Sequence, residues 1–283
     1  MVCQETVKDL ALIANKVRVE VIEICHNVGP ERKAHPGPAL SIVDILVALY
    51  FHVMKVDPAQ PRWAERDRFI LSKGHACPAL YAVLAEKGYF PKELLTGLRH
   101  IGSMLQGHPD MTKTPGIDMT TGSLGHGLSA GLGMALAARI DGKDHRIFVL
   151  LGDGEMQEGL VWEAAMFAGN SNMGNVTAVI DCNGLQSTGS TPAKMNAESI
   201  AGRWQSFGWD ATLIDGHDME EIVGSFDCGI RSSSAPRVIV AKTVKGKGVS
   251  FMENNNEWHQ RSLSRTEYLQ ALTELASERG KAP

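Results

Sequence analysis

Two short stretches decide the fold: Val-Leu-Leu-Gly-Asp-Gly-Glu at residues 149–155 and Val-Ile-Asp-Cys-Asn-Gly-Leu at residues 179–185. Each is an apolar run that stops at glycine and polar residues, which is typical of a buried strand ending in a turn. A helix from Glu155 to Gly169 is predicted between them by apolar residues at helical spacing: Met156, Leu160, Ala164 and Phe167. Asn183 follows Asp153 by 30 positions, about the length of one strand-helix-strand crossover. We therefore expect these two residues at the carboxyl ends of neighbouring parallel strands.

A carboxylate oxygen from Asp153 and an amide oxygen from Asn183 are suitable ligands for a small divalent cation. Mg²⁺ prefers a few protein oxygens together with phosphate and water, and a helix start at Glu155 would offer free N–H groups to anionic oxygens. The pair predicts a site for a metal ion and a diphosphate at the sheet edge where open α/β sheets bind ligands. In the alternative interpretation, Gly-Asp-Gly only reverses the chain and Asn183 caps another segment.

The order Gly-Asp-Gly, crossover, Asn resembles the thiamine diphosphate motif in the form found in the N-terminal half of transketolases. The resemblance implies that Asp153, Asn183 and the backbone carbonyl of Leu185 hold Mg²⁺, for which Ca²⁺ or Mn²⁺ could substitute. It also implies that Gly154 and Glu155 contact the diphosphate of the cofactor.

Four further segments carry histidine or lysine in patterns similar to transketolase motifs: His-Pro-Gly at 35–37, Ser-Lys-Gly-His at 72–75, Gly-His-Pro at 107–109 and Glu-Trp-His at 257–259. A basic loop, Lys242 to Gly248, precedes the last of them. The resemblance implies that Lys73, His75, Lys245 and His259 contact the cofactor, and it makes four histidines catalytic candidates: His35, His75, His108 and His259. Imidazole suits proton transfer because it titrates near working pH.

A glycine-rich turn, Thr121 to Gly127, is predicted to open a helix that runs to about Ala138. Glycines at a helix start let a diphosphate approach the backbone, although the spacing is not that of a dinucleotide fingerprint. The resemblance assigns Gly122, Ser123 and Leu124 to cofactor binding.

Glu158 is predicted one turn into the helix that follows Gly-Asp-Gly, where the helix dipole favours a carboxylate. The family has a glutamate here at the dimer interface, so Glu158 is a further catalytic candidate. Two residues depart from the family pattern. Pro38 stands where a small or hydroxyl residue is usual, and His126 stands where glutamine is usual.

The remaining elements follow from apolar spacing. Helices are predicted over 4–28, 41–53, 78–87, 197–207 and 218–226, with Asp218 as a cap, and strands from Arg68 and over 176–180, 209–214 and 237–243. We expect an irregular segment over 98–119, a connector over 189–195, and an exposed helix with a frayed end over 265–283. Strands alternating with helices predict one α/β domain, residues 1–283, with a doubly wound parallel sheet and a core of about residues 10–260.

Composition excludes several classes of protein. The net charge is −4 and the basic residues form no long run, which argues against a nucleic-acid partner. No apolar stretch is long enough to span a membrane and residues 1–10 are too polar for a signal peptide, so a cytoplasmic location is expected. The five cysteines are scattered without a C-x-x-C pair, which argues against structural zinc and a disulfide framework, and Cys182 is expected to fill space beside its strand.

Taken together, the resemblance implies a thiamine diphosphate- and Mg²⁺-dependent transketolase subunit that transfers a two-carbon ketol unit from a ketose phosphate to an aldose or aldose phosphate. The pyrimidine-binding domain of transketolases is absent, so we expect the partner in a heterotetramer to be a separate C-terminal subunit. The alternatives are a split transketolase for a sulfonated or branched sugar phosphate, the α subunit of a 2-oxo acid dehydrogenase, and a non-catalytic cofactor-binding scaffold. The segments Ser-Lys-Gly-His and Glu-Trp-His argue against the 2-oxo acid dehydrogenase subunit. The retained Asp153, Asn183 and histidines argue against the non-catalytic scaffold.

Overall fold

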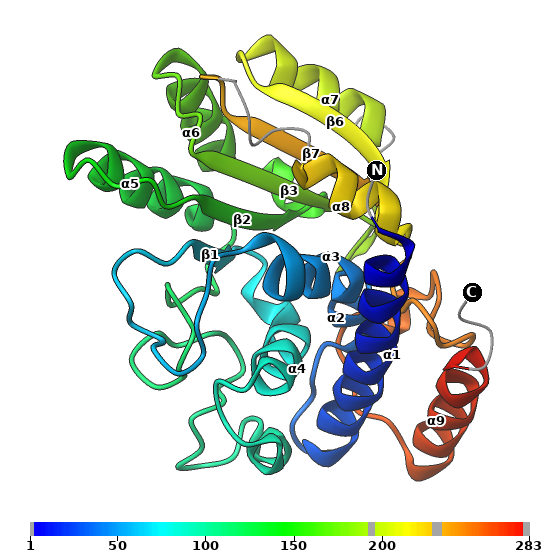
Figure 1. Ribbon diagram of the computed structural model, residues 1–283. Coiled ribbons are helices and arrows are strands. Elements are labelled where there is room, and N and C mark those ends of the chain that lie inside the picture. The colour runs from blue at the N-terminus through cyan, green and yellow to red at the C-terminus, as the bar shows by residue number, and fades with distance from the viewer. Residues whose placement is uncertain (1–2, 192–195, 228–233, 280–283) are drawn as a thin grey trace.

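A five-stranded parallel sheet lies at the centre of the computed structural model, which describes residues 3–191, 196–227 and 234–279 (Figure 1). The strand order is β1-β2-β3-β7-β6. The strands are β1 (Arg68–Leu71), β2 (Ile147–Gly152), β3 (Val176–Cys182), β6 (Asp210–Asp215) and β7 (Arg237–Lys242). Gly152 of β2 is paired with Asp181 of β3, so the turns that contain Asp153 and Asn183 follow neighbouring parallel strands. This part of the prediction is confirmed.

Helices cover both faces of the sheet, as expected for a doubly wound fold. Alternate side chains of β2 enter two separate cores: Val149 and Leu151 pack on one face, and Phe148 and Leu150 on the other. The first face is covered by α5 (His126–Ile140), α6 (Gly159–Asn170) and α7 (Ala197–Ser206). The second is covered by α1 (Gln4–Asn27), α3 (Val43–Ala48), α4 (Cys77–Lys87) and α8 (Met219–Asp227), which Asp218 caps through the N–H groups of Glu220 and Glu221.

Short elements shape the loops between these helices and strands. The predicted helix over 41–53 is α3 followed by a π-helical turn at Leu49–Val53, and the expected His-Pro-Gly loop is itself a short helix, α2 (Pro36–Leu40). Single 3₁₀ turns occur at Gly74–Ala76, Lys92–Gly97, Gly154–Gln157 and Asn256–His259, and β4 (Leu185–Gln186) pairs with β5 (Gly189–Ser190). Residues 192–195 of the predicted connector 189–195 lie outside the described residues, and so does Cys228.

The helix after Gly-Asp-Gly differs from its prediction in both start and face. It begins at Gly159, because residues 154–157 form a 3₁₀ turn and Glu158 is extended. Phe167 is 48% exposed, while Val161, Ala165 and Ala168 are buried. Apolar residues occur on nearly every side of this helix, so their spacing did not identify the buried face. Similarly, α5 begins at His126 rather than Thr121, since Gly125 is left-handed with φ 83°.

The last helix, α9 (Arg265–Arg279), is not the exposed tail that the sequence predicts. It lies along α1, and its Ala271 and Leu275 are completely buried there (Figure 1). The chain therefore brings its first and last helices together on one side of the molecule.

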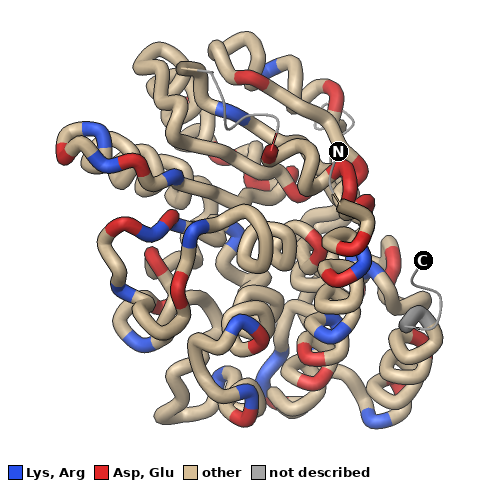
Figure 2. The backbone as a smooth tube through the Cα atoms, viewed as in Figure 1, with Lys and Arg blue, Asp and Glu red and all other residues tan. Residues whose placement is uncertain are grey.

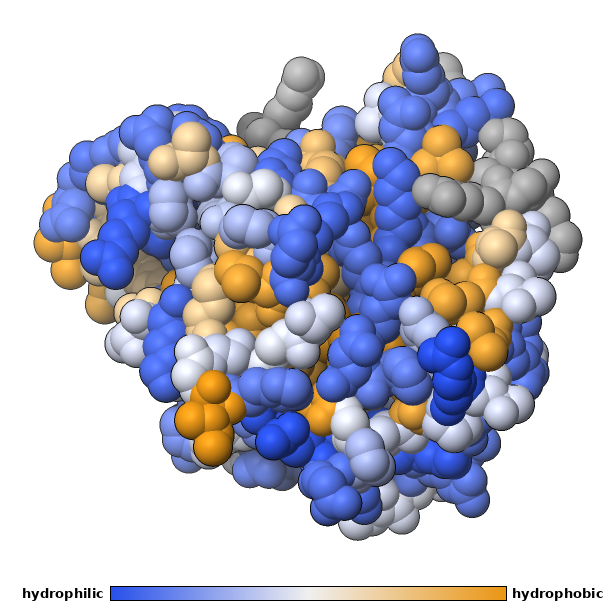
Figure 3. All heavy atoms as spheres, turned by 90° about the horizontal axis from the view of Figure 1, so that it is seen from below, coloured by the Kyte–Doolittle hydropathy of each residue, from blue (hydrophilic) through white to orange (hydrophobic). Residues whose placement is uncertain are grey.

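The irregular segment after residue 97 continues to Gly125 and lies over the end of α4, longer than predicted. The face seen in Figure 3 is mostly hydrophilic, with hydrophobic side chains in small groups between polar ones. Within the described ranges, no helix combines the length and apolar character needed to cross a bilayer.

Candidate active site

A cavity of about 450 Å³ opens at the carboxyl ends of β1, β2 and β3. This volume falls in the range of small-molecule and cofactor sites. Most of the predicted site residues line it: His35, Lys73, His75, Gly122, Leu124, Asp153, Gly154, Glu155, Glu158, Asn183, Leu185 and His259. Ser123, His108 and Lys245 are not among the lining residues.

Asp153 is buried at the floor of the cavity, and no side chain of the described residues forms an ion pair with it. Its Oδ1 accepts the N–H of Gly154 and its Oδ2 accepts the N–H of Gly184, both at 2.8 Å. Burial and the neighbouring carboxylate of Asp181 raise the pKa of Asp153 to about 6. A carboxylate that bonds to two backbone N–H groups and weakly to Thr191 retains lone pairs for a cation.

Asn183 follows β3 as Asp153 follows β2, and the two residues lie close together because the N–H of Gly184 donates to Asp153. Its Nδ2 donates to Asp181 at 2.9 Å, and its Oδ1 accepts the N–H of Leu185 at 3.0 Å. These two bonds fix the amide orientation, leaving one lone pair of Oδ1 beside the cavity.

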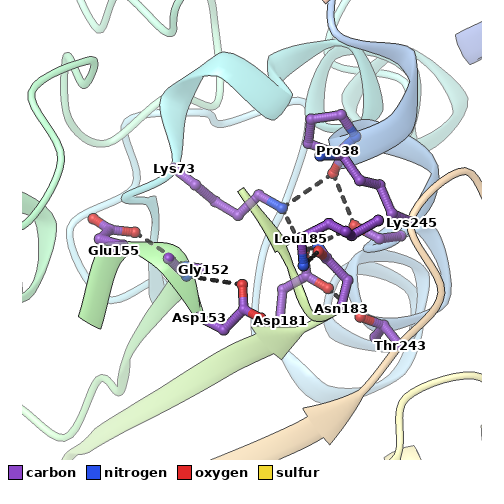
Figure 4. A network of polar contacts seen from close by, with 12 residues as sticks. Pro38, Lys73, Gly152, Asp153, Glu155, Asp181, Asn183, Leu185, Thr243 and Lys245 are labelled. Carbon is purple, nitrogen blue, oxygen red and sulfur yellow. Dashed lines mark hydrogen bonds and ion pairs between the residues drawn. The ribbon is translucent and has the colours of Figure 1, made fainter. Parts of the chain in front are cut away.

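Asp181 holds this edge together, although the sequence analysis did not select it as a site residue. It is fully buried and accepts hydrogen bonds from Lys73, Ser41, Thr243 and Asn183 (Figure 4). Burial opposes its ionisation, but the ammonium of Lys73 and the two hydroxyl donors hold the pKa of Asp181 below its usual value. The signal in the sequence was an acidic residue at the end of an otherwise apolar strand, two positions before Asn183.

Lys73 extends from the end of β1 toward Asp181 and also donates to the Pro38 carbonyl at 3.2 Å (Figure 4). An ammonium group has three protons, so one remains for an anion in the cavity. Pro38 therefore takes part through its backbone carbonyl, which also accepts the Ser41 hydroxyl at 3.0 Å.

Glu155 lies in the 3₁₀ turn Gly154–Gln157 and not at the start of the predicted helix, which begins at Gly159. Its carboxylate turns into the protein and accepts Ser72 Oγ together with the N–H groups of Gly125 at 2.7 Å and Gly152 at 3.1 Å. Burial raises its pKa, against the effect of these donors. Glu155 therefore joins the glycine-rich turn to the end of β2, with its side chain engaged in structural bonds.

Three histidines form a cluster at one side of the cavity. The ring centroids of His35 and His75 are 5.2 Å apart, those of His35 and His259 5.6 Å, and those of His75 and His259 5.3 Å. Burial, with neighbouring positive charges, lowers the pKa of His35 to about 3 and of His259 to about 4, and it also lowers that of His75. All three rings are therefore neutral at pH 7 and can both donate and accept hydrogen bonds.

Lys245, which the resemblance assigns to cofactor contact, lies behind this cluster and is fully buried. Its Nζ bonds Asn256 Oδ1 at 2.8 Å and His259 Nδ1 at 2.9 Å. Since an ammonium can only donate, Nδ1 of His259 accepts and the ring proton is on Nε2. Burial and the charge of Lys73 lower the pKa of Lys245 to about 8.

His108 and Glu158 lie at the rim. A Cβ atom on Gly122 would lie 3.5 Å from the His108 ring, which places this exposed histidine beside the glycine-rich turn. Glu158 is exposed before the first turn of α6 and packs against Gly125, where a Cβ would come within 2.9 Å of it. Ser123 and His126 are exposed, and the His126 ring lies 3.2 Å from the carbonyl of Leu124.

The donor set fits a divalent cation and a diphosphate. Asp153 supplies a buried carboxylate, Asn183 an amide oxygen, and Leu185 a place for a backbone carbonyl in the same cavity. The described residues contain no group of three or more His, Cys, Asp or Glu side chains placed to hold a metal ion. Cys182 packs against the core on the face of the sheet that α5, α6 and α7 cover.

Comparison with known proteins identifies the family to which this chain belongs. Residues 11–280 match the family described as "Transketolase, thiamine diphosphate binding domain". The chain therefore belongs to the transketolase family, and it corresponds to the N-terminal, cofactor-binding part of those enzymes.

Relatives divide into short and long proteins. The 6-deoxy-6-sulfo-D-fructose transketolase subunit SqwG of Clostridium sp. (strain MSTE9) is 46% identical over 95% of this chain and 97% of its own length. One of the apulose-4-phosphate transketolase subunits, from Phocaeicola vulgatus, is 42% identical over 95% of both chains. The transketolase of Campylobacter jejuni superimposes with a TM-score of 0.85 at 29% identity, over 99% of this chain but 43% of the longer one. This chain thus matches the short relatives over nearly their whole length and the long transketolase over less than half of its length.

Proposed function

We propose that this chain holds thiamine diphosphate and Mg²⁺ in the cavity at the sheet edge and acts with a separate pyrimidine-binding subunit. The observation that supports this most directly is the buried carboxylate of Asp153, which lies beside Asn183 and Leu185 and forms no ion pair within the described part of the chain. A divalent cation there would offset the burial of charge. When bound, the cofactor supplies the electron sink for breaking a carbon–carbon bond.

In this proposal the residues of the chain divide between holding the cofactor and handling the sugar. Asp153, Asn183 and the Leu185 carbonyl hold the metal. Lys73, with its remaining proton, and Gly154, which has no side chain to intervene, bind the diphosphate. Four histidines then orient hydroxyl groups of the sugar and move protons: His35, His75, His108 and His259. His259 donates through its Nε2 atom.

A partner subunit would cover the exposed side of α5 and α6. Four large apolar side chains are exposed there: Leu136, Ile140, Met166 and Phe167. Glu158 lies exposed at the beginning of α6, next to this surface and to the cavity. We infer that the partner buries these side chains in a heterotetramer and completes each cofactor site. The assembly acts in the cytoplasm.

The substrate is a ketose that carries an anionic group, phosphate or sulfonate, remote from the carbonyl carbon. The names of the two similar subunits, one for a sulfonated sugar and one for a branched sugar phosphate, support this range. The phosphate of xylulose 5-phosphate falls within it, and ribose 5-phosphate is a suitable acceptor.

The test is reconstitution. The purified chain, thiamine diphosphate, Mg²⁺ and each donor sugar are mixed with ribose 5-phosphate, with and without a separately encoded pyrimidine-binding chain. We expect ketol transfer only when both chains are present. Turnover by this chain alone would overturn the split assembly, and absence of Mg²⁺-dependent cofactor binding by the reconstituted pair would overturn the cofactor site.

A further inference from the structure

A second cavity, of about 500 Å³, lies at the opposite end of the strands, at the amino ends of β2, β3 and β7. Strand β2 has six residues, so the two cavities are about 20 Å apart along it, at roughly 3.3 Å per residue. Four basic side chains line this cavity: Arg139, Lys143, Arg146 and Arg237. Charged residues are concentrated at the end of α5 and in the turn that leads into β2 (Figure 2).

Within the described residues, two of the four basic side chains have carboxylate partners and two do not. Lys143 pairs with Glu65 at 2.5 Å, and Arg146 pairs with Asp67 at 2.6 Å. Arg139 donates to the carbonyl oxygens of Ser171 and Asn172, at 3.1 and 2.8 Å. Arg237 donates to the carbonyl of Ser225 at 2.6 Å. Asp144 is the acidic side chain among the described lining residues, so the lining carries an excess of positive charge.

Arg237 makes this excess significant because it is buried. The side chain is only 8% exposed, and in the part of the chain that the structure describes its Nε has no hydrogen-bond partner. Burying a charged group whose donors are incompletely bonded costs free energy, and a nearby opposite charge reduces that cost. No carboxylate of the described residues pairs with this guanidinium.

The wall of the cavity strengthens any electrostatic attraction inside it. Phe148 and Phe226 are almost fully buried and meet edge to face, with ring centroids 5.9 Å apart. The guanidinium of Arg146 lies 5.1 Å from the centroid of the Phe148 ring. These two rings form the apolar part of a wall that is otherwise mostly polar, and charges beside them interact more strongly than in open water.

We propose that this cavity is a second anion site, which takes a small oxyanion of the phosphate class, either inorganic phosphate or a phosphate monoester. Guanidinium groups match the geometry of phosphate oxygens through paired N–H donors. Arg237 supplies the buried contact and Arg139 the exposed one. The site is independent of the cofactor site because it uses none of its residues.

The test is a titration of inorganic phosphate into the chain saturated with thiamine diphosphate and Mg²⁺, at constant ionic strength, followed by calorimetry. We expect binding to persist with the cofactor site filled, and to weaken at least about tenfold in Arg237→Met and in Arg139→Glu. Arg265→Glu, the same charge change at an exposed position on α9, is the matched control and should bind like the wild type. A second titration with glycerol 2-phosphate distinguishes free phosphate from a monoester.

Several outcomes would overturn the proposal. Phosphate binding that disappears when the cofactor is loaded would assign the anion to the cofactor cavity. Equal affinity in wild type and Arg139→Glu would show that the basic cavity is not involved, and this exposed substitution decides the matter if Arg237→Met fails to fold. If the chain does not bind thiamine diphosphate, the same variants titrated without cofactor still test the second site, so the two proposals fail separately.

Discussion

Asp153 and Asp181 are the same residue type at the ends of neighbouring strands, yet their surroundings are opposite. Asp181 is enclosed by Lys73 and three other side-chain donors, whereas Asp153 faces the cavity and bonds mainly to backbone N–H groups. The pKa of Asp181 is lowered and that of Asp153 is raised to about 6. One carboxylate completes the protein's own structure, and the other retains capacity for an external cation.

The buried lysines repeat this contrast with the opposite charge. Lys73 has the carboxylate of Asp181, whereas Lys245 has the neutral partners Asn256 and His259. Among the described residues, the site therefore contains one internally neutralised pair, whereas Asp153, Glu155 and Lys245 are buried without an ion-pair partner. This division predicts which substitutions affect stability and which affect binding.

The largest effect is expected from Asp181→Asn. Removing this charge leaves Lys73 buried without a counter-ion, and breaking a buried pair in this way costs about 3–5 kcal/mol. Urea unfolding should show the loss in the free chain, without any cofactor. The double variant Asp181→Asn with Lys73→Met should recover part of it. A loss below about 1 kcal/mol in the single variant would contradict the structural role of Asp181.

Asp153→Asn should affect binding instead of stability. One of the two ligand side chains loses its charge, so Mg²⁺ affinity in the presence of thiamine diphosphate should fall by at least about 100-fold. The free energy of unfolding should change by less than about 2 kcal/mol, since removal of an uncompensated buried carboxylate opposes the loss of one of its two backbone hydrogen bonds. Calorimetry with Mg²⁺ and urea unfolding of the same sample separate the two effects. Equal losses of stability in Asp153→Asn and Asp181→Asn would remove the distinction between the two carboxylates.

Lys245 should make stability depend on pH. Its pKa is lowered to about 8 in the folded chain from 10.5, so the folded state binds this proton less tightly than the unfolded state does. The free energy of unfolding should therefore rise between about pH 8 and pH 10.5, by about 3 kcal/mol from this residue. Lys245→Met should remove that rise, and Lys247→Met, at a half-exposed position nearby, should retain it. Identical pH profiles for Lys245→Met and wild type would contradict an unmatched buried charge.

The smallest effects on stability are expected from substitutions of two threonines. Thr243 donates to Asp181 through a short bond, and Thr191 lies 3.4 Å from Asp153. Thr243→Val should destabilise by about 1.5 kcal/mol, since it removes a hydrogen bond to a buried charge, and Thr191→Val by less than about 0.5 kcal/mol. Thermal unfolding measures both. A larger loss for Thr191→Val would show that Asp153 is already saturated by its protein donors.

Much of the fold and of the site follows from the sequence. Apolar strands ending at Gly-Asp-Gly and at Asn183 gave the correct neighbours, because only side-chain period and crossover length are needed for that inference. The resemblance to transketolase motifs also selected His35, His75 and His259, which lie together in the structure. These residues mark the ends of secondary-structure elements, where local sequence is most informative.

The remainder depended on contacts between distant residues. The bond from Asp181 to Ser41 spans 140 positions, and nothing near Asp181 indicates that Lys73 will neutralise it. Lys245 occurs among other lysines, which suggests a solvated loop, but the chain folds over it. Glu155 bonds Gly125, 30 positions away, so its inward orientation was not visible locally.

His35 and His259 come from distant parts of the chain, next to α1 and α9, which lie side by side. The cofactor pocket can therefore be completed only after the segment with His259 has been made and has folded back onto α2, late in synthesis, because contacts between remote segments form slowly. A nascent chain that stops after β7 would have a full sheet and the turns with Asp153 and Asn183 but an incomplete histidine cluster. Cofactor retention by this protein would then report that translation has passed His259.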